Sequence, residues 1–283
     1  MQFSRDTAEI FIPDGVSIEQ ALARTTHLTI SAHHDDIEIM ASQPILQCFQ
    51  RQDMWFTGVV LNDGRGSPRD GMYKEYTDEA MRQVRIKEQK KAAFIGEYAA
   101  LVLLDYPSKE IKDNSDNRVT DDIVQILNTT HPQLVYTHNL ADKHDTHVAT
   151  ALRVIRAIRS LLDTERPQKL YGCEVWRDLD WMVDSDKVAF DLSAQENLQM
   201  ALLGVYDSQI SGGKRYDLAS LGRRRANATY YESHGVDTSS ELTYAMDLTP
   251  LIVSPERDIF AYVQEYIQRF AHDVADRLTR LGK

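Results

Sequence analysis

The sequence predicts an α/β fold, a Rossmann-like, doubly wound and mostly parallel sheet flanked by helices. Two observations predict it. Short apolar, β-branched runs alternate with helical patterns along the chain, which is typical of βαβ units. No internal repeat and no Pro/Gly/Ser-rich linker divides the 283 residues. Because a common strand order in such sheets is 3-2-1-4-5, we expect that order here.

The expected elements follow one another along the chain. Apolar runs predict strands at residues 28–32, 55–61, 100–104, 133–137, 169–173 and 188–192. Helical spacing predicts helices at residues 39–51, 78–96, 121–127, 148–162 and 198–205. Residues 1–26 are interpreted as an N-terminal extension with a short helix over residues 18–24, and residues 27–283 as a single domain.

A last helix closes the chain. Ser254 is expected to be its N-cap and Pro255 its first helical residue. Its apolar residues recur at helical spacing and are expected to form its core face, at Ile259, Val263, Ile267, Phe270, Val274 and Leu278.

Composition and charge exclude several classes of protein. The net charge of −11 argues against a nucleic-acid or anionic-membrane partner, and no run reaches the ~18–20 apolar residues that cross a bilayer. The basic run Arg223–Arg225 is the local exception, and a solvated helix end is favoured over a phosphate site. Cys48 and Cys173 lack metal-site spacing and are expected to be buried free thiols. With no secretory signal expected at the N-terminus, we predict a cytoplasmic protein with a small-molecule partner.

Five of the nine histidines lie in two clusters, each placed where an expected strand ends. His33 and His34 follow the first strand, and His138, His144 and His147 follow the fourth. In the order 3-2-1-4-5 these strands are neighbours, and the chain leaves them in opposite directions at the topological switch point, where ligands bind. The two clusters are therefore expected to meet in one crevice.

Imidazole and carboxylate groups are ligands for a borderline metal such as Zn²⁺, and this donor set also accepts Fe²⁺, Co²⁺ or Mn²⁺. His33 and Asp36 can both face one ion from the first loop, with Asp35 free to point at its water. A set of two histidines and one aspartate, completed by His147, leaves positions open for water and substrate. His138 is expected to line the crevice without necessarily binding metal.

Several stretches resemble one known family. Ala32–Glu38 reads AHHDDIE and resembles the AHxDDxE motif of the PIG-L/LmbE-like zinc-dependent deacetylases, and Asp142–His147 resembles that family's later histidine motif. Residues 62–64, 85–88 and 206–209 resemble further family elements. The family removes acetyl or related acyl groups from N-acylated amino sugars and their conjugates, on a Rossmann-like fold.

The resemblance implies His33, Asp36 and His147 as zinc ligands. It implies Asp35 as the general base and His144 as the group that stabilises the oxyanion and protonates the leaving amine, with Asp142 expected to keep His144 charged. The residues expected to bind substrate are Arg85, Asp63, Arg65 and Trp176. The supporting carboxylates expected around the site are Glu38, Asp142 and Asp145. The chain departs from the family pattern at His34, where a small residue or proline is usual, and at Thr146, where aspartate is common.

Three interpretations of function stay open. The favoured one is a zinc-dependent N-deacetylase of an amino-sugar derivative. The others are a metal-dependent hydrolase of another bond, such as a phosphoester or another amide, and a non-catalytic ligand-binding protein on the same fold. The loop over residues 63–76 is either a lid or a disordered surface loop, and Trp176 either stacks on a sugar or, as favoured, packs in the core. Self-association stays open as well.

Overall fold

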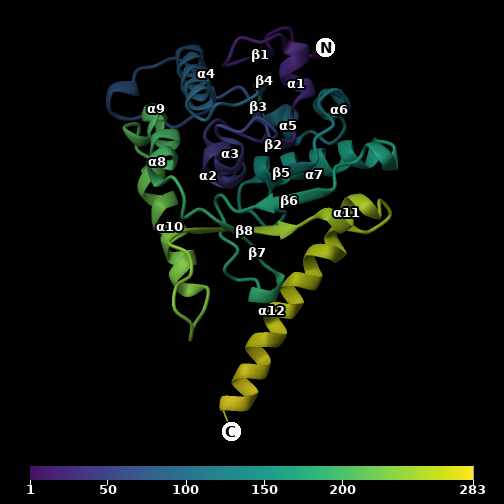
Figure 1. Cartoon of the computed structure of the whole chain (residues 1–283), viewed down its shortest axis with the longest axis vertical. Coiled ribbons are helices and arrows are strands. Elements are labelled where there is room, and N and C mark those ends of the chain that lie inside the picture. Colours follow the sequence, from purple (N-terminus) through teal and green to yellow (C-terminus); the bar gives the residue numbers. More distant parts are fainter. Residues whose placement is uncertain (283) are drawn as a thin grey trace.

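The computed structural model describes residues 1–282, and its centre is a parallel sheet (Figure 1). Five strands pair in parallel in the order β4 (Ala100–Tyr106), β3 (Phe56–Asn62), β2 (His27–Ser31), β5 (Leu134–His138) and β6 (Lys169–Cys173). In chain order this is 3-2-1-4-5, so the predicted topology is confirmed. Strands β2, β3 and β4 are buried along their whole length because helices cover both faces of the sheet.

Antiparallel strands extend the sheet at both edges. β1 (Glu9–Phe11) pairs with β4, so the first residues of the chain join the sheet. At the other edge β8 (Leu242–Asp247) pairs with β6, and β7 (Val188–Asp191) pairs with β8. β8 was not predicted, because five of its six residues are buried and the strand lacks the polar alternation that marks a half-exposed strand.

Helices connect these strands and pack on both faces of the sheet (Figure 1). In chain order the helices and 3₁₀ turns are α1 (Ile18–Ala23), α2 (Asp36–Met40), α3 (Ser42–Cys48), η1 (Gly71–Tyr73), α4 (Asp78–Ile95), α5 (Ser108–Lys112), α6 (Arg118–Thr130), α7 (Asp145–Ser160), η2 (Asp163–Glu165), η3 (Asp184–Asp186), α8 (Glu196–Gly204), α9 (Asp207–Ile210), α10 (Tyr216–Tyr230), α11 (Thr249–Val253) and α12 (Ile259–Leu281). No helix within residues 1–282 is both long enough and apolar enough to cross a membrane.

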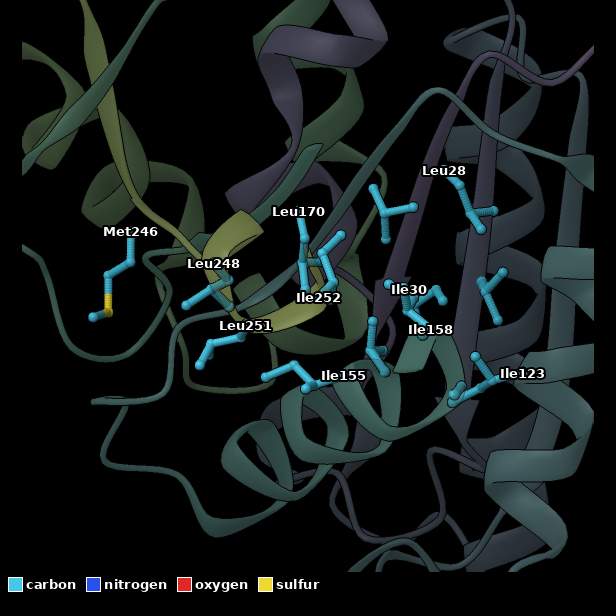
Figure 2. Packing of buried hydrophobic residues seen from close by; sticks show 14 of the residues in the cluster. Leu28, Ile30, Ile123, Ile155, Ile158, Leu170, Met246, Leu248, Leu251 and Ile252 are labelled. Atoms are coloured by element: carbon cyan, nitrogen blue, oxygen red, sulfur yellow. The ribbon is translucent and has the colours of Figure 1, made fainter. Parts of the chain in front are cut away.

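Two hydrophobic cores lie on opposite faces of the sheet, because successive side chains of a strand point to opposite sides. On one face Leu28 and Ile30 of β2 pack with Ile155 and Ile158 of α7 (Figure 2). The core of the other face is built from residues of α2, α3, α4 and α8 against the same strands. Cys48 and Cys173 are buried free thiols, as predicted.

The helix predicted over residues 39–51 is instead two short helices. α2 ends at Met40 and α3 begins at Ser42, with Ala41 between them at φ −119° and ψ 26°. Pro44 explains the break, because it has no N–H to bond to the carbonyl of Met40 and its ring would clash with that carbonyl. The break lets α2 start at Asp36, directly at the end of the first cluster.

The start of the last helix was predicted wrongly. Ser254 ends α11, and the N-cap of α12 is Asp258, whose Oδ1 accepts a hydrogen bond from the backbone N–H of Ala261 at 2.7 Å. Pro255 lies in the intervening turn, in which the N–H of Arg257 bonds to the carbonyl of Ser254. Aspartate and serine are comparable N-cap residues, so residue type alone does not separate Asp258 from Ser254.

The core face predicted for this helix is also wrong over most of its length. Ile267, Phe270 and Val274 are each about two-fifths exposed, and Leu278 is 69% exposed. The first half of the helix contacts the domain, through the buried side chains Tyr262 and Tyr266, the ion pair of Arg269 with Asp186, and the contact of the Phe270 ring with that of Trp181. Beyond them α12 extends away from the sheet (Figure 1). Amphipathic spacing correctly predicted the helix, but spacing cannot show whether the chain itself covers the apolar face.

Candidate metal centre and active site

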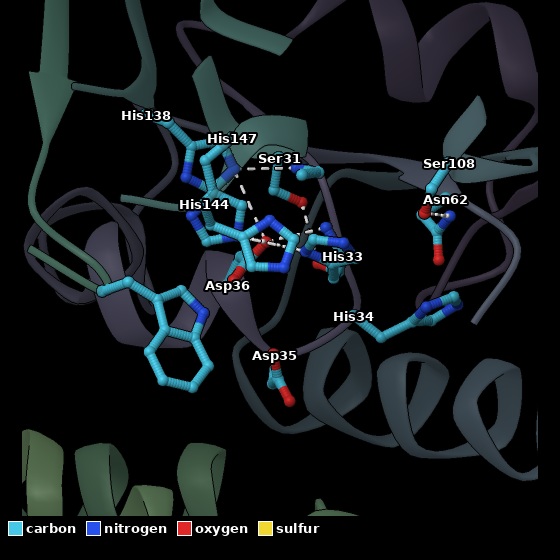
Figure 3. A network of polar contacts seen from close by, with 12 residues as sticks. Ser31, His33, His34, Asp35, Asp36, Asn62, Ser108, His138, His144 and His147 are labelled. Atoms are coloured by element: carbon cyan, nitrogen blue, oxygen red, sulfur yellow. Dashed lines mark hydrogen bonds and ion pairs between the residues drawn. The ribbon is translucent and has the colours of Figure 1, made fainter. Parts of the chain in front are cut away.

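The two histidine clusters meet at the carboxyl ends of β2 and β5 (Figure 3). His33 Nδ1 lies 3.2 Å from Asp36 Oδ2 and 3.1 Å from His147 Nε2. His147 Nε2 lies 3.3 Å from the same carboxylate oxygen. Ligand atoms about 2.0–2.1 Å from a tetrahedral zinc ion stand about 3.3–3.4 Å from one another. These three atoms, which we call the triangle, are therefore spaced to hold one ion and to leave a fourth position open.

His138 lies next to this triangle but has a different task. Its Nε2 accepts a hydrogen bond from the backbone N–H of Ala32 at 2.8 Å, so the lone pair that would bind a metal is already used. Its ring stacks on that of His147, with centroids 3.9 Å apart. Asp36, His138 and His147 also lie close enough together to be a possible ligand group. We favour the group of His33, Asp36 and His147, because no backbone N–H donates to Nδ1 of His33.

The charges of the triangle are strongly coupled. Burial would raise the pKa of Asp36, but the adjacent His147 and His138 outweigh burial and hold that pKa well below its ordinary value. Burial would lower the pKa of His147, but Asp36 and Asp142 raise it to about 9. A proton on His147 therefore supplies the positive charge that a metal ion would supply, and a metal ion would have to displace that proton in order to bind.

Asp35 stands beside the triangle with its backbone in the left-handed region, at φ 80°. Its Oδ2 accepts a hydrogen bond from Arg85 Nη2 at 2.7 Å, and its backbone N–H donates to Gln89 Oε1 at 3.1 Å. Burial raises the pKa of Asp35 to about 6, although the Arg85 guanidinium opposes that rise. A non-glycine residue in this conformation stores roughly 1–3 kcal/mol of strain, and such residues cluster at functional sites. The strain is balanced here by contacts from α4.

Arg85 is fully buried between two loops and links three of the family-like motifs. Besides Asp35, its Nη2 donates to the carbonyl oxygen of His34 at 2.6 Å, and its Nη1 donates to Glu88 Oε2 at 3.2 Å. Glu88 in turn accepts from the backbone N–H and the hydroxyl of Ser208, each at 2.7 Å. Arg85 lines the cavity, but its terminal nitrogens are already bonded, so it holds Asp35 in place.

Glu38 lies behind the catalytic loop and is completely buried. Its Oε1 accepts hydrogen bonds from Tyr98 at 2.6 Å and from Gln89 Nε2 at 2.8 Å, and its Oε2 accepts one from Tyr206 at 2.5 Å. Burial raises the pKa of Glu38 to about 7 even though the two tyrosine hydroxyls oppose it. Because Gln89 also holds the backbone of Asp35, Glu38 fixes that loop indirectly.

The Asp142 carboxylate contacts the backbone of His144 and faces the ring of His147. Its Oδ1 accepts from the backbone N–H of His144 at 2.9 Å and its Oδ2 accepts from that of Trp176 at 3.1 Å. The same Oδ2 faces His147 Nδ1 at 3.6 Å. Burial and the neighbouring His33 and His147 lower the pKa of His144, although the Asp36 and Asp142 carboxylates oppose that fall.

The remaining predicted residues take varied positions. Asp63 and Arg65 pair with each other, Oδ2 to Nη1 at 2.9 Å, and neither is among the residues that line the cavity. Residues 66–68 of their loop form part of the cavity wall. Asp145 is exposed at the first position of α7 and forms no side-chain hydrogen bond within residues 1–282. Trp176 is half-buried: it packs against the hydrophobic core, as favoured, and it also lines the cavity.

A cavity of about 680 Å³ opens above the triangle and Asp35, within the size range of small-molecule sites. His144 lines it, with its ring 4.6 Å from that of His147 and 6.3 Å from that of Trp176. Sequence reasoning missed the side of the cavity formed by Lys214, Tyr216 and Arg223. The basic run that includes Arg223 was the available signal, and it was interpreted as a solvated helix end.

Comparison with known proteins agrees with this site. A model of the PIG-L family, described as GlcNAc-PI de-N-acetylase, matches residues 28–158, the segment that carries both histidine clusters. Over this segment the chain is similar to the PIG-L, or LmbE-like, family. No curated protein matched the chain. Lys214, Tyr216 and Arg223 lie outside the matched segment, so this side of the cavity is not described by the PIG-L model.

Solved structures share the fold at low identity. The 4-carboxy-2-hydroxymuconate hydratase GalB from Pseudomonas putida is 16% identical, with a TM-score of 0.61 over 79% of this chain and 96% of that one. The conserved protein TT1542 from Thermus thermophilus is 17% identical, with a TM-score of 0.61 over 83% and 99%. The N,N'-diacetylchitobiose deacetylase from Pyrococcus horikoshii is 17% identical, with a TM-score of 0.59 over 78% and 83%. These likenesses establish the LmbE-like, Rossmann-like fold.

Proposed function

We propose that this protein is a zinc-dependent hydrolase that removes an N-acetyl, or related N-acyl, group from an amino-sugar derivative. The observation that carries the proposal is the triangle of His33, Asp36 and His147 atoms, spaced 3.1–3.3 Å apart, at the floor of a cavity that Asp35 also lines. The match of residues 28–158 to the PIG-L family model and the shared fold of a deacetylase support the same reaction.

Each residue has a distinct task in this proposal. His33, Asp36 and His147 would hold the ion, which supplies Lewis acidity and makes water more acidic when bound. Asp35 would accept the proton of the attacking water at the oxygen that is not bonded to Arg85. His144, on the Trp176 side of the cavity, would face the developing oxyanion and then give a proton to the leaving nitrogen.

Replacing Asp35 by asparagine tests the proposal, because asparagine keeps the size of the side chain but cannot accept the proton. Acetate release from N-acetylated sugars should fall by roughly 10²–10⁴-fold while zinc content stays at the wild-type level. Asp63→Asn is the matched control, since Asp63 is an equally buried aspartate that does not line the cavity. Full activity of the Asp35→Asn enzyme would refute the assignment of the base.

One observation favours a second candidate. Lys143, Lys214 and Arg223 line the cavity, and cations suit a substrate that carries carboxylates. Addition of water to an unsaturated carboxylate needs the same base, acid and metal, and the similar fold of GalB belongs to a hydratase. Loss of the ultraviolet absorbance of an unsaturated acid, without release of amine from any amide, would favour it. Release of phosphate alone from a substrate panel would instead favour a phosphoesterase.

A further inference from the structure

We infer that the outer part of the cavity is an anion-binding subsite, formed by Lys143, Lys214 and Arg223, for a carboxylate or phosphate group on the substrate. The inference rests on the proposed function for the sugar part of that substrate. Two of the three cations, Lys214 and Arg223, lie outside the residues matched by the family model.

The three cations come from separate elements and line the same cavity. Lys143 precedes His144 in the loop between β5 and α7, Lys214 lies in the loop between α9 and α10, and Arg223 lies on α10. Lys214 Nζ is 5.0 Å from the centroid of the Trp176 ring. Arg223 Nη1 donates to the carbonyl oxygen of Val175, the residue before Trp176. Lys214 and Arg223 therefore lie on the Trp176 side of the cavity, and Lys143 lines the same cavity next to His144.

None of these cations forms an ion pair within residues 1–282, although the charge of Arg223 partly offsets the rise that burial causes in the pKa of Glu174. Within residues 1–282, no carboxylate oxygen lies within 4.0 Å of a side-chain nitrogen of Lys143, Lys214 or Arg223. Most arginines elsewhere on the surface do pair in this way, in a chain whose net charge is −11. Exposed lysines such as Lys87 and Lys91 also lack an ion pair within residues 1–282, so what distinguishes these three cations is that they line one cavity, where their fields add.

The acidic residues that line the same cavity are already occupied. Asp35 pairs with Arg85, and Asp36 is surrounded by imidazoles. Glu174 is buried and accepts hydrogen bonds from Asn227 Nδ2 at 2.7 Å and from the backbone N–H of Tyr244 at 3.0 Å. Arg224, the remaining cation, is buried and donates to Gln199, Ser42 and backbone carbonyls of α2. The uncompensated charge of the outer cavity is thus positive.

Trp176 sets the position of the anion relative to the reacting amide. Its ring lies between His144, at 6.3 Å between centroids, and Lys214. Tyr216 meets its edge at 6.1 Å and closes the wall. A sugar stacked on this ring would present its amide to His144 and its neighbouring substituent to Lys214 and Arg223. The favoured substrate is therefore an N-acyl amino sugar whose aglycone carries the negative charge.

The test compares ligands that differ only in the charge of the aglycone. Because glucosaminides have no acyl group, they bind without turnover, and calorimetry can follow methyl glucosaminide, carboxymethyl glucosaminide and glucosamine 1-phosphate. We expect the two anionic ligands to bind about tenfold more tightly than the methyl compound, as for a hydrogen bond to a charged group. The carboxymethyl and phosphate ligands show which anion is preferred.

Exposed lysines supply variants that do not disturb the core. Lys143→Gln and Lys214→Gln are each expected to reduce the preference for the anionic ligands to roughly threefold or less, as expected for loss of one charge. Lys91→Gln is the matched control, because Lys91 is an exposed lysine on α4 that does not line this cavity. The control should retain the wild-type preference.

The outcomes separate this inference from the proposed function when acetate release is measured in parallel. Equal affinity for charged and uncharged glucosaminides would overturn the subsite, even if acetate is released. Tight binding of the sugar-free trianion tricarballylate, weakened by Lys214→Gln and accompanied by no glucosaminide binding and no acetate release, would support the subsite and overturn the deacetylase. Anion binding that survives both lysine substitutions unchanged would overturn the assignment of these residues.

Discussion

Substitution of Glu38 by glutamine is expected to remove a dependence of stability on pH. The pKa of a glutamate is 4.5 when it is exposed in the unfolded chain, and burial raises that of Glu38 to about 7 in the fold. Between these two pH values the folded protein binds more protons than the unfolded chain, so stability falls as the pH rises from about 4.5 to about 7. Glutamine is neutral throughout, and its amide can keep bonds to Gln89 and the two tyrosines.

The size of the effect follows from the same pKa values. One unit corresponds to about 1.4 kcal/mol, so the wild type should lose up to about 3 kcal/mol relative to Glu38→Gln between pH 5 and pH 8. Urea unfolding of both metal-free proteins across that range, followed by tryptophan fluorescence, measures this difference. Glu75→Gln is the control, because Glu75 is exposed and has no side-chain hydrogen bond within residues 1–282. A difference between wild type and Glu38→Gln that stays constant with pH would refute the reasoning.

Further predictions concern the ion and the helices. His147→Ala should abolish stoichiometric zinc binding in elemental analysis after dialysis, whereas His138→Ala, which removes a stacked ring and the acceptor for the backbone N–H of Ala32, should lower zinc affinity by roughly 10–100-fold; equal losses would contradict the assigned ligand. Val274→Ala should change the free energy of unfolding by less than about 0.5 kcal/mol, while Ile155→Ala should lower it by about 2–5 kcal/mol. A large loss at position 274 would show that this face is covered in solution. Asp258→Ala should cost about 1 kcal/mol of stability in the same urea experiment, and no loss would contradict its role as a cap.

The order of the central strands could be predicted because it depends on patterns that the sequence displays. Alternation of strands and helices indicated five parallel strands, and the switch point then placed the two histidine clusters together. β8 escaped prediction because an almost fully buried strand shows no alternation. The exposed face of α12 escaped it because spacing reveals an apolar stripe but not what covers it.

The residues of the site also divide into those that could be predicted from the sequence and those that could not. His33, Asp36 and His147 could be proposed from local spacing and one topological rule, and their atoms lie within 3.3 Å of each other. Lys214 and Tyr216 could not, because they reach the cavity from a segment after α9 whose path depends on tertiary packing. Asp142 was placed near the site, but only coordinates could show that its carboxylate bonds the backbone of His144 and faces the ring of His147.

A crystal structure of the zinc-loaded protein, with the ion located by its anomalous scattering, tests the central claim most directly. The proposed geometry predicts one ion within about 2.0–2.2 Å of His33 Nδ1, Asp36 Oδ2 and His147 Nε2, with a fourth position facing the cavity. An ion bound by His138, or one that leaves His147 beyond bonding distance, would contradict the account.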